Sequence, residues 1–224
     1  MTAALALIAG YLFGSLSGAR IMGRVWAAGH DLSRTKVVLD GTGASVITRG
    51  VSPAALQARA GGAGGLRAGA IDILKVLLPT LAAGLIWPAG PEMFLVAAGG
   101  LIGHVYPVYH RFAGGFGISP LLGALLVIDW RALLVAIAAF AILGLVFGSA
   151  YLGIETWPLG LVPWFVWQGD AWGVGLAVLA NLMYWWRSRS ELIAAARSWR
   201  RDERPWRLRV KDFARYPDYE VPSE

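Results

Sequence analysis

The sequence predicts an all-α, polytopic membrane protein with about seven transmembrane helices and a basic cytoplasmic C-terminal tail. Hydrophobic residues occupy 57% of the 224 positions and charged residues only 15%, a composition unusual for a soluble domain. Apolar segments follow one another to about residue 186, and several approach the ~20 residues needed to cross a bilayer core. These observations divide the chain into a membrane domain, residues 1–186, and a tail, residues 187–224.

The arginines that flank the apolar segments predict the topology, because cytoplasmic loops are enriched in Lys and Arg. In the first segment Arg20 and Arg24 follow the apolar core instead of preceding it, which indicates an uncleaved helix with its N-terminus outside. Alternation from that end leaves Arg131 as the only basic residue in an external turn. Membrane segments are expected at 3–25, 66–87, 93–109, 118–128, 132–148, 159–167 and 171–186, and cytoplasmic loops at 29–69, 110–117 and 149–157.

The remaining composition argues against several kinds of site. The chain has no cysteine, which excludes disulfides and thiolate metal ligands, and its three histidines include no His-x-x-x-His pair. We therefore predict neither a metal nor a cofactor. The net charge of +6 follows from the cytoplasmic loops and tail, so we expect membrane lipid, and not nucleic acid, as the partner of the basic residues.

Two ionisable residues lie inside the second predicted segment. Asp72 and Lys75 are three positions apart and therefore share one face of the helix. Charges at membrane depth are costly and usually face protein or water as a pair. A purely structural ion pair and a phosphate-binding site both fit this spacing. Lys75 is the only lysine inside a predicted segment, which makes it the best candidate among the lysines to contact a phosphate.

A glycine-rich loop separates the third and fourth predicted segments. His104 lies near the end of the third segment, and Gly114-Gly115-Phe116-Gly117 precedes the fourth. The backbone N–H groups of such a loop at a helix start can approach an anion, and the helix dipole favours negative charge there. His110 and Arg111 would add positive charge at the same edge. The alternative is a tight turn between helices, with His104 as a hydrogen-bonded packing residue.

The residues around this loop resemble the central motif of the bacterial acyl-phosphate-dependent glycerol-3-phosphate acyltransferases, which are integral membrane enzymes. The shared pattern is G-H-x-x-P-x-x-x-x-F-x-G-G-x-G, carried here by Gly103, His104, Pro107, Phe112, Gly114, Gly115 and Gly117. In that family the loop reads G-G-K-G and binds phosphate. Here Phe116 stands in the place of the lysine.

Further segments are similar to the same family. Residues 10–18 resemble its opening G-Y-L-x-G-S, in which Ser15 could line a polar cavity or bond back to its own helix. Gly41-Thr42-Gly43 resembles the start of G-S-G-N-x-G-A-T-N, whose serine is a catalytic-site residue, although an ordinary turn is the alternative. Ala44 and Arg49 replace the two asparagines of that motif.

The resemblance continues into the second segment and reaches the tail. Asp72 and Lys75 match the family's D-x-x-K-G, whereas Ser188 and Glu191 replace the histidine and asparagine of its R-H-R-x-N-I. Just before the second segment, residues 61–65 (Gly-Gly-Ala-Gly-Gly) are expected to form a flexible linker.

The resemblance implies transfer of a fatty acyl group from acyl phosphate to the 1-hydroxyl of glycerol 3-phosphate, giving lysophosphatidic acid at the cell membrane. The changed positions leave open a relative of altered or lost activity that binds lipid or a partner enzyme. A small transporter is disfavoured, because the buried charges lie near one end only. The candidate catalytic residues are Thr42 and His104, and the candidate substrate-binding residues are Ser15, Arg49, Asp72, Lys75, Arg111, Gly114, Gly115 and Gly117.

Overall fold

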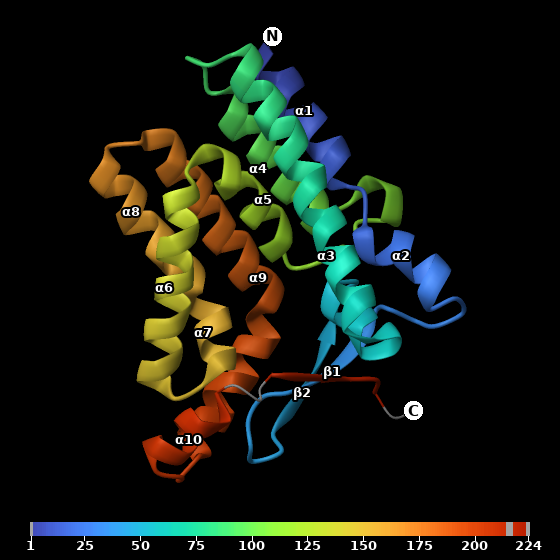
Figure 1. Ribbon diagram of the computed structural model, residues 1–224, viewed down its shortest axis with the longest axis vertical. Helices are drawn as coiled ribbons and strands as arrows, with labels where there is room; N and C mark the ends of the chain where they lie inside the picture. The colour runs from blue at the N-terminus through green and yellow to red at the C-terminus, as the bar shows by residue number, and fades with distance from the viewer. Residues whose placement is uncertain (1, 214–216, 223–224) are drawn as a thin grey trace.

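The computed structural model describes residues 2–213 and 217–222, and most of them are helical (Figure 1). The elements run in the order α1 (Thr2–Gly14), α2 (Gly18–Trp26), β1 (Arg34–Val38), β2 (Ser45–Arg49), α3 (Pro53–Ile86), α4 (Glu92–Val105), η1 (Val108–His110), α5 (Ile118–Ile128), α6 (Trp130–Phe147), α7 (Ala150–Thr156), η2 (Trp157–Gly160), α8 (Leu161–Gln168), α9 (Ala171–Arg201), α10 (Trp206–Asp212) and β3 (Asp218–Glu220).

The long helices form two groups, with α5 between them (Figure 1). In the first group, α1, α3 and α4 approach one another closely through small residues. A Cβ atom at Gly10 or Gly14 of α1 would lie 2.1 Å from a carbonyl oxygen of α4, so only glycine permits this packing. The second group, α6, α8 and α9, surrounds an apolar core that includes Leu125, Leu161 and Phe165.

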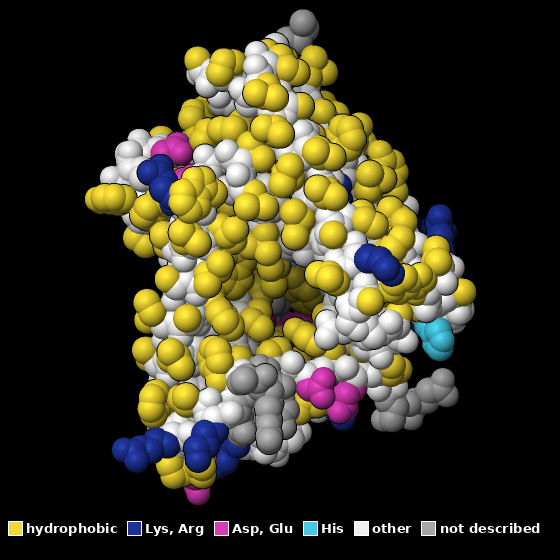
Figure 2. Space-filling view, viewed as in Figure 1, with side chains coloured by type: hydrophobic (Ala, Val, Ile, Leu, Met, Phe, Trp, Pro, Cys, Tyr) yellow, Lys and Arg dark blue, Asp and Glu magenta, His cyan; other side chains and the backbone are white. Residues whose placement is uncertain are grey.

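Three segments of the described chain are long and apolar enough to cross a membrane, namely residues 2–26, 53–86 and 130–147. Hydrophobic side chains cover most of the face shown in Figure 2, where basic side chains gather at the lower end and also lie at the upper left and on the right. Each of the seven predicted segments is mostly helical, but the first is broken between Gly14 and Gly18, and α4 ends at Val105, before the predicted end of the third segment at residue 109. The mostly helical prediction is therefore confirmed, while the number of seven crossings stays a prediction.

The all-α prediction missed a small antiparallel sheet with the strand order β2-β1-β3. Strand β1 pairs with β2 in the register Arg34↔Arg49 and with β3 in the register Lys36↔Glu220. Residues 34–49 carry enough charge to resemble a loop, but both strands are rich in β-branched residues, Thr35, Val37 and Val38 in β1 and Val46, Ile47 and Thr48 in β2, which favours strands. The sheet occupies the lower end of the molecule in Figure 1.

The flexible linker expected at residues 61–65 is wrong, because these residues lie inside α3. The helix is interrupted at Gly61, whose φ of 75° places it in the left-handed region that favours glycine. The first turns of α3 fold back, so that a Cβ atom at Gly65 would lie 2.8 Å from the Cβ of Gln57. This kink brings Ser52 and Pro53, at the start of α3, toward the helix groups.

Helix α9 continues to Arg201 through the predicted domain boundary at residue 186. Beyond that point, aromatic side chains attach the chain to the end of α6. Trp199 Nε1 donates to the Phe147 carbonyl (2.6 Å), and Trp206 Nε1 donates to the Leu145 carbonyl (2.8 Å). The division into a membrane domain and a tail stays a prediction.

Candidate active site

Three buried polar side chains meet where α3 and α4 face the break between α1 and α2. Lys75 Nζ donates to Asp72 Oδ1 (2.8 Å), to His104 Nδ1 (2.8 Å) and to the carbonyl oxygen of Leu16. The Gly18 N–H, at the start of α2, also donates to Asp72 Oδ1 (3.0 Å). Asp72 is 1% exposed and Lys75 6% exposed, so the expectation that this pair faces the protein interior is confirmed.

Lys75 is fully engaged within the protein in this structure. An ammonium group has three N–H donors and no acceptor. All three donors of Lys75 already have protein partners, one of them the charged Asp72. The pair therefore supports His104 here, and the contact of Lys75 with a phosphate stays a prediction.

His104 is held in one orientation by this cluster. Because an ammonium group can only donate, Nδ1 of His104 accepts, and in the neutral ring Nε2 then carries the hydrogen. Nε2 faces the glycine loop, where a Cβ atom at Gly115 would lie only 2.3 Å away. His104 is thus a hydrogen-bond donor directed toward the loop.

The glycine loop wraps closely around the end of α4. A Cβ atom at Gly114 would lie 2.0 Å from the His104 carbonyl oxygen and 2.6 Å from Pro107 Cδ. The same carbonyl oxygen accepts from the Gly115 N–H (3.2 Å), which commits that amide to the protein itself. Gly117, with φ of 96°, then starts α5. The loop is therefore fixed in place beneath His104.

A cation that sequence analysis missed lies beside this loop. The guanidinium of Arg187, on α9, lies 5.3 Å from the centre of the Phe116 ring. Its Nη2 donates to the carbonyl oxygens of Gly114 (3.3 Å) and Arg49. The sequence carried one signal for Arg187, because it is the first arginine of the stretch that resembles R-H-R-x-N-I.

The two arginines predicted to serve this loop are placed differently. Arg111 ends η1 in a left-handed conformation and is exposed. Arg49 contributes its carbonyl oxygen to Arg187, while its side chain lines a separate groove. That groove is flanked by Tyr106, Phe112 and Trp186 and is also lined by Arg187, Arg189 and Glu191. It is a cationic depression next to the glycine loop.

Two predicted hydroxyl residues lie away from the cavity that His104 lines. Thr42 is exposed at the hairpin turn, hydrogen-bonded to Asp40, and lines a depression against α9. The prediction that it acts together with His104 is therefore not supported by its position. Ser15 is buried and bonds back to its own helix, donating to the Tyr11 carbonyl (2.8 Å). It also accepts from the Val108 N–H (3.4 Å), so it fastens η1 to α1.

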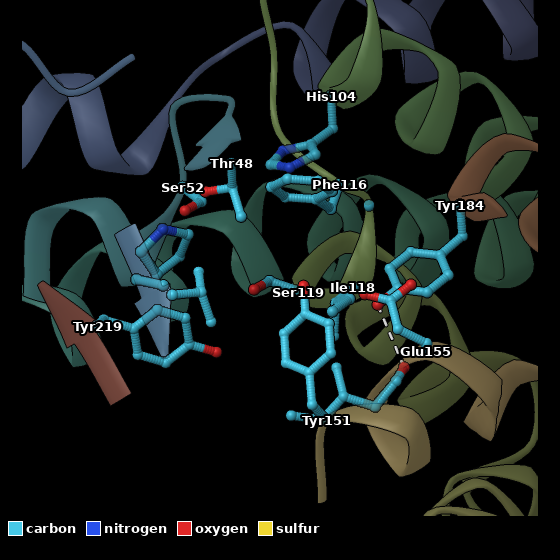
Figure 3. A pocket seen from close by; sticks show the side chains of 15 residues that line it. Thr48, Ser52, His104, Phe116, Ile118, Ser119, Tyr151, Glu155, Tyr184 and Tyr219 are labelled. Atoms are coloured by element: carbon cyan, nitrogen blue, oxygen red, sulfur yellow. Dashed lines mark hydrogen bonds between the residues drawn. The ribbon is translucent and has the colours of Figure 1, made fainter. Parts of the chain in front are cut away.

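His104 and Phe116 open onto a cavity of about 190 Å3 between the two helix groups. Figure 2 shows a dark hollow at this level, with acidic atoms at its floor. Figure 3 shows hydroxyl groups on several sides of the cavity, and none of the described residues that line it is Lys or Arg. The hydroxyl groups belong to Thr48, Ser52, Ser119, Tyr151, Tyr184 and Tyr219.

The carboxylate that lines the cavity is Glu155 of α7, which sequence analysis did not single out. It is 2% exposed, and its Oε2 accepts from Ser188 Oγ (2.7 Å). Burial raises its pKa to about 7. A signal was present, because Glu155 is the only acidic residue between Asp129 and Asp170.

A model of the family described as glycerol-3-phosphate acyltransferase matches residues 4–197. The glycerol-3-phosphate acyltransferase of Thioalkalivibrio sulfidiphilus is 30% identical over 195 residues, covering 86% of this chain and 90% of that protein. Glycerol-3-phosphate acyltransferase 1 of Oceanobacillus iheyensis is 28% identical over 194 residues, covering 79% and 84% respectively.

Solved structures with a similar fold include two of PlsY (YgiH), an integral membrane glycerol 3-phosphate acyltransferase. Its glycerol 3-phosphate form superposes with a TM-score of 0.73 at 19% identity, covering 94% of this chain and 99% of that one. Its lysphosphatidic acid form gives a TM-score of 0.72 at 20% identity with the same coverage. At these identities the likeness concerns the fold alone.

Proposed function

This chain belongs to the glycerol-3-phosphate acyltransferase family, and on that premise we propose that it transfers a fatty acyl group from acyl phosphate to the 1-hydroxyl of glycerol 3-phosphate. The product is lysophosphatidic acid. The observation that carries the proposal is the placement of His104, which Lys75 holds with Nε2 toward the glycine loop and the cavity.

The reaction requires three things of the protein. It must stabilise the oxyanion that develops when the hydroxyl attacks the acyl carbonyl, orient that hydroxyl, and hold two anionic substrates side by side. The Nε2–H of His104 supplies a fixed donor for the oxyanion. Arg187 and the groove it shares with Arg49 supply positive charge for a phosphate. No covalent acyl-enzyme is needed, because phosphate is already a good leaving group.

The test is a direct assay on the full chain purified in detergent. Acyl phosphate and glycerol 3-phosphate are supplied, and lysophosphatidic acid is measured by mass spectrometry. We expect product, and we expect His104→Ala to reduce its rate about 100-fold, as for removal of an oxyanion donor. A wild type that forms no product would contradict the proposed function, and an unchanged rate in His104→Ala would contradict the role of His104 alone. Product from an acyl thioester but not from acyl phosphate would contradict the proposed donor alone.

We further propose that the protein is a multi-pass protein of the cell membrane with its C-terminus in the cytoplasm. The distribution of arginines supports this orientation. A reporter enzyme that works only outside the cytoplasm, fused after the last residue, should be inactive, whereas the same reporter in the external turn at residues 88–91 should be active. The opposite pattern would overturn the orientation.

A further inference from the structure

We propose that Glu155 is the general base of the acyl transfer, removing the proton from the acceptor hydroxyl inside the cavity that His104 and Phe116 line. The proposal rests on the proposed function, because it assigns a role within that reaction. Glu155 lies outside every motif position through which the chain resembles its family.

His104 is not suited to accept that proton. Its Nδ1 is occupied by Lys75, and its Nε2 is a donor in the neutral ring. A histidine fixed in this way can stabilise negative charge but has no free lone pair for a hydroxyl hydrogen. The acceptor for the proton must therefore be a group other than His104.

Glu155 is the only carboxylate among the described residues that line the cavity. Figure 3 shows Glu155 and Tyr151 on the lower side of the cavity and Tyr184 at its right, while His104 and Phe116 lie on the upper side in that view. A hydroxyl group bound between these two sides would meet a proton acceptor from below and an oxyanion donor from above. Such a division of labour between a base and a donor accelerates acyl transfer to an alcohol.

The surroundings keep Glu155 available at neutral pH. The groups that face it are Tyr151 of its own helix, Tyr184, Ser188 and Glu191 of α9, and Tyr219 of β3, with His104 across the cavity. Burial raises the pKa of Glu155 to about 7, and the hydrogen bond from Ser188 opposes that rise. Glu155 lies in the predicted cytoplasmic loop at 149–157, outside the predicted membrane segments. A base with this pKa is partly ionised at neutral pH, where proton transfer is most efficient.

The step balances without any further reactant. The acceptor O–H proton passes to a Glu155 carboxylate oxygen, and the hydroxyl oxygen forms a bond to the acyl carbon. The bond between that carbon and the phosphate oxygen breaks, and the electron pair leaves with inorganic phosphate. Protonated Glu155 then returns its proton to the phosphate or to water, which restores the carboxylate.

The rival explanation is a structural role, in which Glu155 only joins α7 to α9 through Ser188. The Glu155→Gln variant distinguishes the role of a general base from the structural role. Glutamine has the same shape and can still accept a hydrogen bond from Ser188, but it cannot take a proton from the acceptor hydroxyl. We expect kcat for lysophosphatidic acid formation to fall at least about 100-fold, and the rise of kcat with pH near 7 to disappear. Glu92→Gln, which changes another buried glutamate at the far end of α4, should leave kcat and its pH profile unchanged.

Ser188→Ala gives a second test that does not depend on how Glu155→Gln folds. Loss of a hydrogen bond to the ionised carboxylate raises its pKa, so the rise of kcat should move upward by about one pH unit. An active wild type whose kcat and pH profile survive both substitutions would overturn the role of Glu155 alone. A wild type that makes no lysophosphatidic acid would overturn the proposed function and, with it, this inference.

Discussion

The two polar clusters of the molecule differ in how completely their groups are satisfied. Between α3 and α4, Lys75 uses all three of its donors within the protein, on Asp72, His104 and a backbone carbonyl. Between α7 and α9, the Glu155 carboxylate has hydrogen bonds with Ser188 (2.7 Å), Tyr151 and Tyr184, fewer than the roughly four that a carboxylate can accept, and it lines an open cavity. The first cluster is a fixed support, and the second leaves an acceptor facing space that a substrate can fill.

We therefore expect that a charge matching a family motif need not be one that contacts the substrate. Lys75 and Arg187 both match motif positions, but Lys75 is fully engaged by the protein, whereas Arg187 lines a groove and Glu155 a cavity. The two clusters meet at His104. Lys75 of the first cluster orients its ring, and Glu155 of the second cluster lies across the cavity from it.

The largest expected effect comes from breaking the fixed cluster. Asp72→Ala leaves the buried Lys75 ammonium without its carboxylate, which typically costs about 3–5 kcal/mol of stability. The melting temperature in detergent should fall sharply. Lys36→Ala breaks the exposed pair with Glu220 and is the matched control, with an expected cost of about 0–1 kcal/mol. Equal losses in the two variants would contradict the assignment of the Asp72 pair as a structural support.

An intermediate effect is expected where the two clusters meet. Gly115→Ala introduces a Cβ atom 2.3 Å from His104 Nε2, so the imidazole or the loop must move. A displacement of about 1 Å can cost roughly 100-fold in rate, and we expect a loss of that size in kcat/KM. Gly175→Ala, at a helical glycine with open space around it, should retain full activity. Retained activity in Gly115→Ala would show that His104 need not be fixed.

The smallest effect is expected at the cations. Arg187→Ala removes a charge beside the glycine loop, and we expect KM for glycerol 3-phosphate to rise roughly tenfold. Arg111→Ala removes an exposed charge whose interaction is screened by salt, and KM should change by less than about twofold. A larger rise in KM for Arg111→Ala than for Arg187→Ala would instead support the prediction that Arg111, which lies close to Phe116 in sequence, supplies the positive charge for the loop.

The spacing of residues in the sequence was sufficient to predict features that depend on a single helix. Asp72 and Lys75 are three positions apart, which predicted that they share one helix face. Because a charge at membrane depth is costly, that face was predicted to point into the protein, and the burial of both residues confirms this. The order and positions of the apolar helices followed from hydropathy in the same way. Family resemblance located His104 and the glycine loop, but the donor orientation of its ring depends on Lys75, 29 residues away in sequence.

The missed features depend on contacts between distant segments. Arg111 lies close to Phe116 in sequence yet ends η1 on the surface, whereas Arg187 reaches Phe116 from α9. The charges within residues 34–49 favour a loop over the hairpin, although β-branched residues are frequent in both strands. Thr42 matched a catalytic position by motif, but the register of that hairpin places it at the turn.

The pairing of β3 with β1 sets an order of assembly for the cavity. Lys36 and Glu220 are 184 residues apart, and Tyr219, next to Glu220, forms part of the cavity wall. During synthesis, every described helix therefore emerges before the strand that completes this wall. A nascent chain can place its helices in the bilayer while the site is still incomplete, and the wall is finished only when β3 is released from the ribosome and joins the sheet.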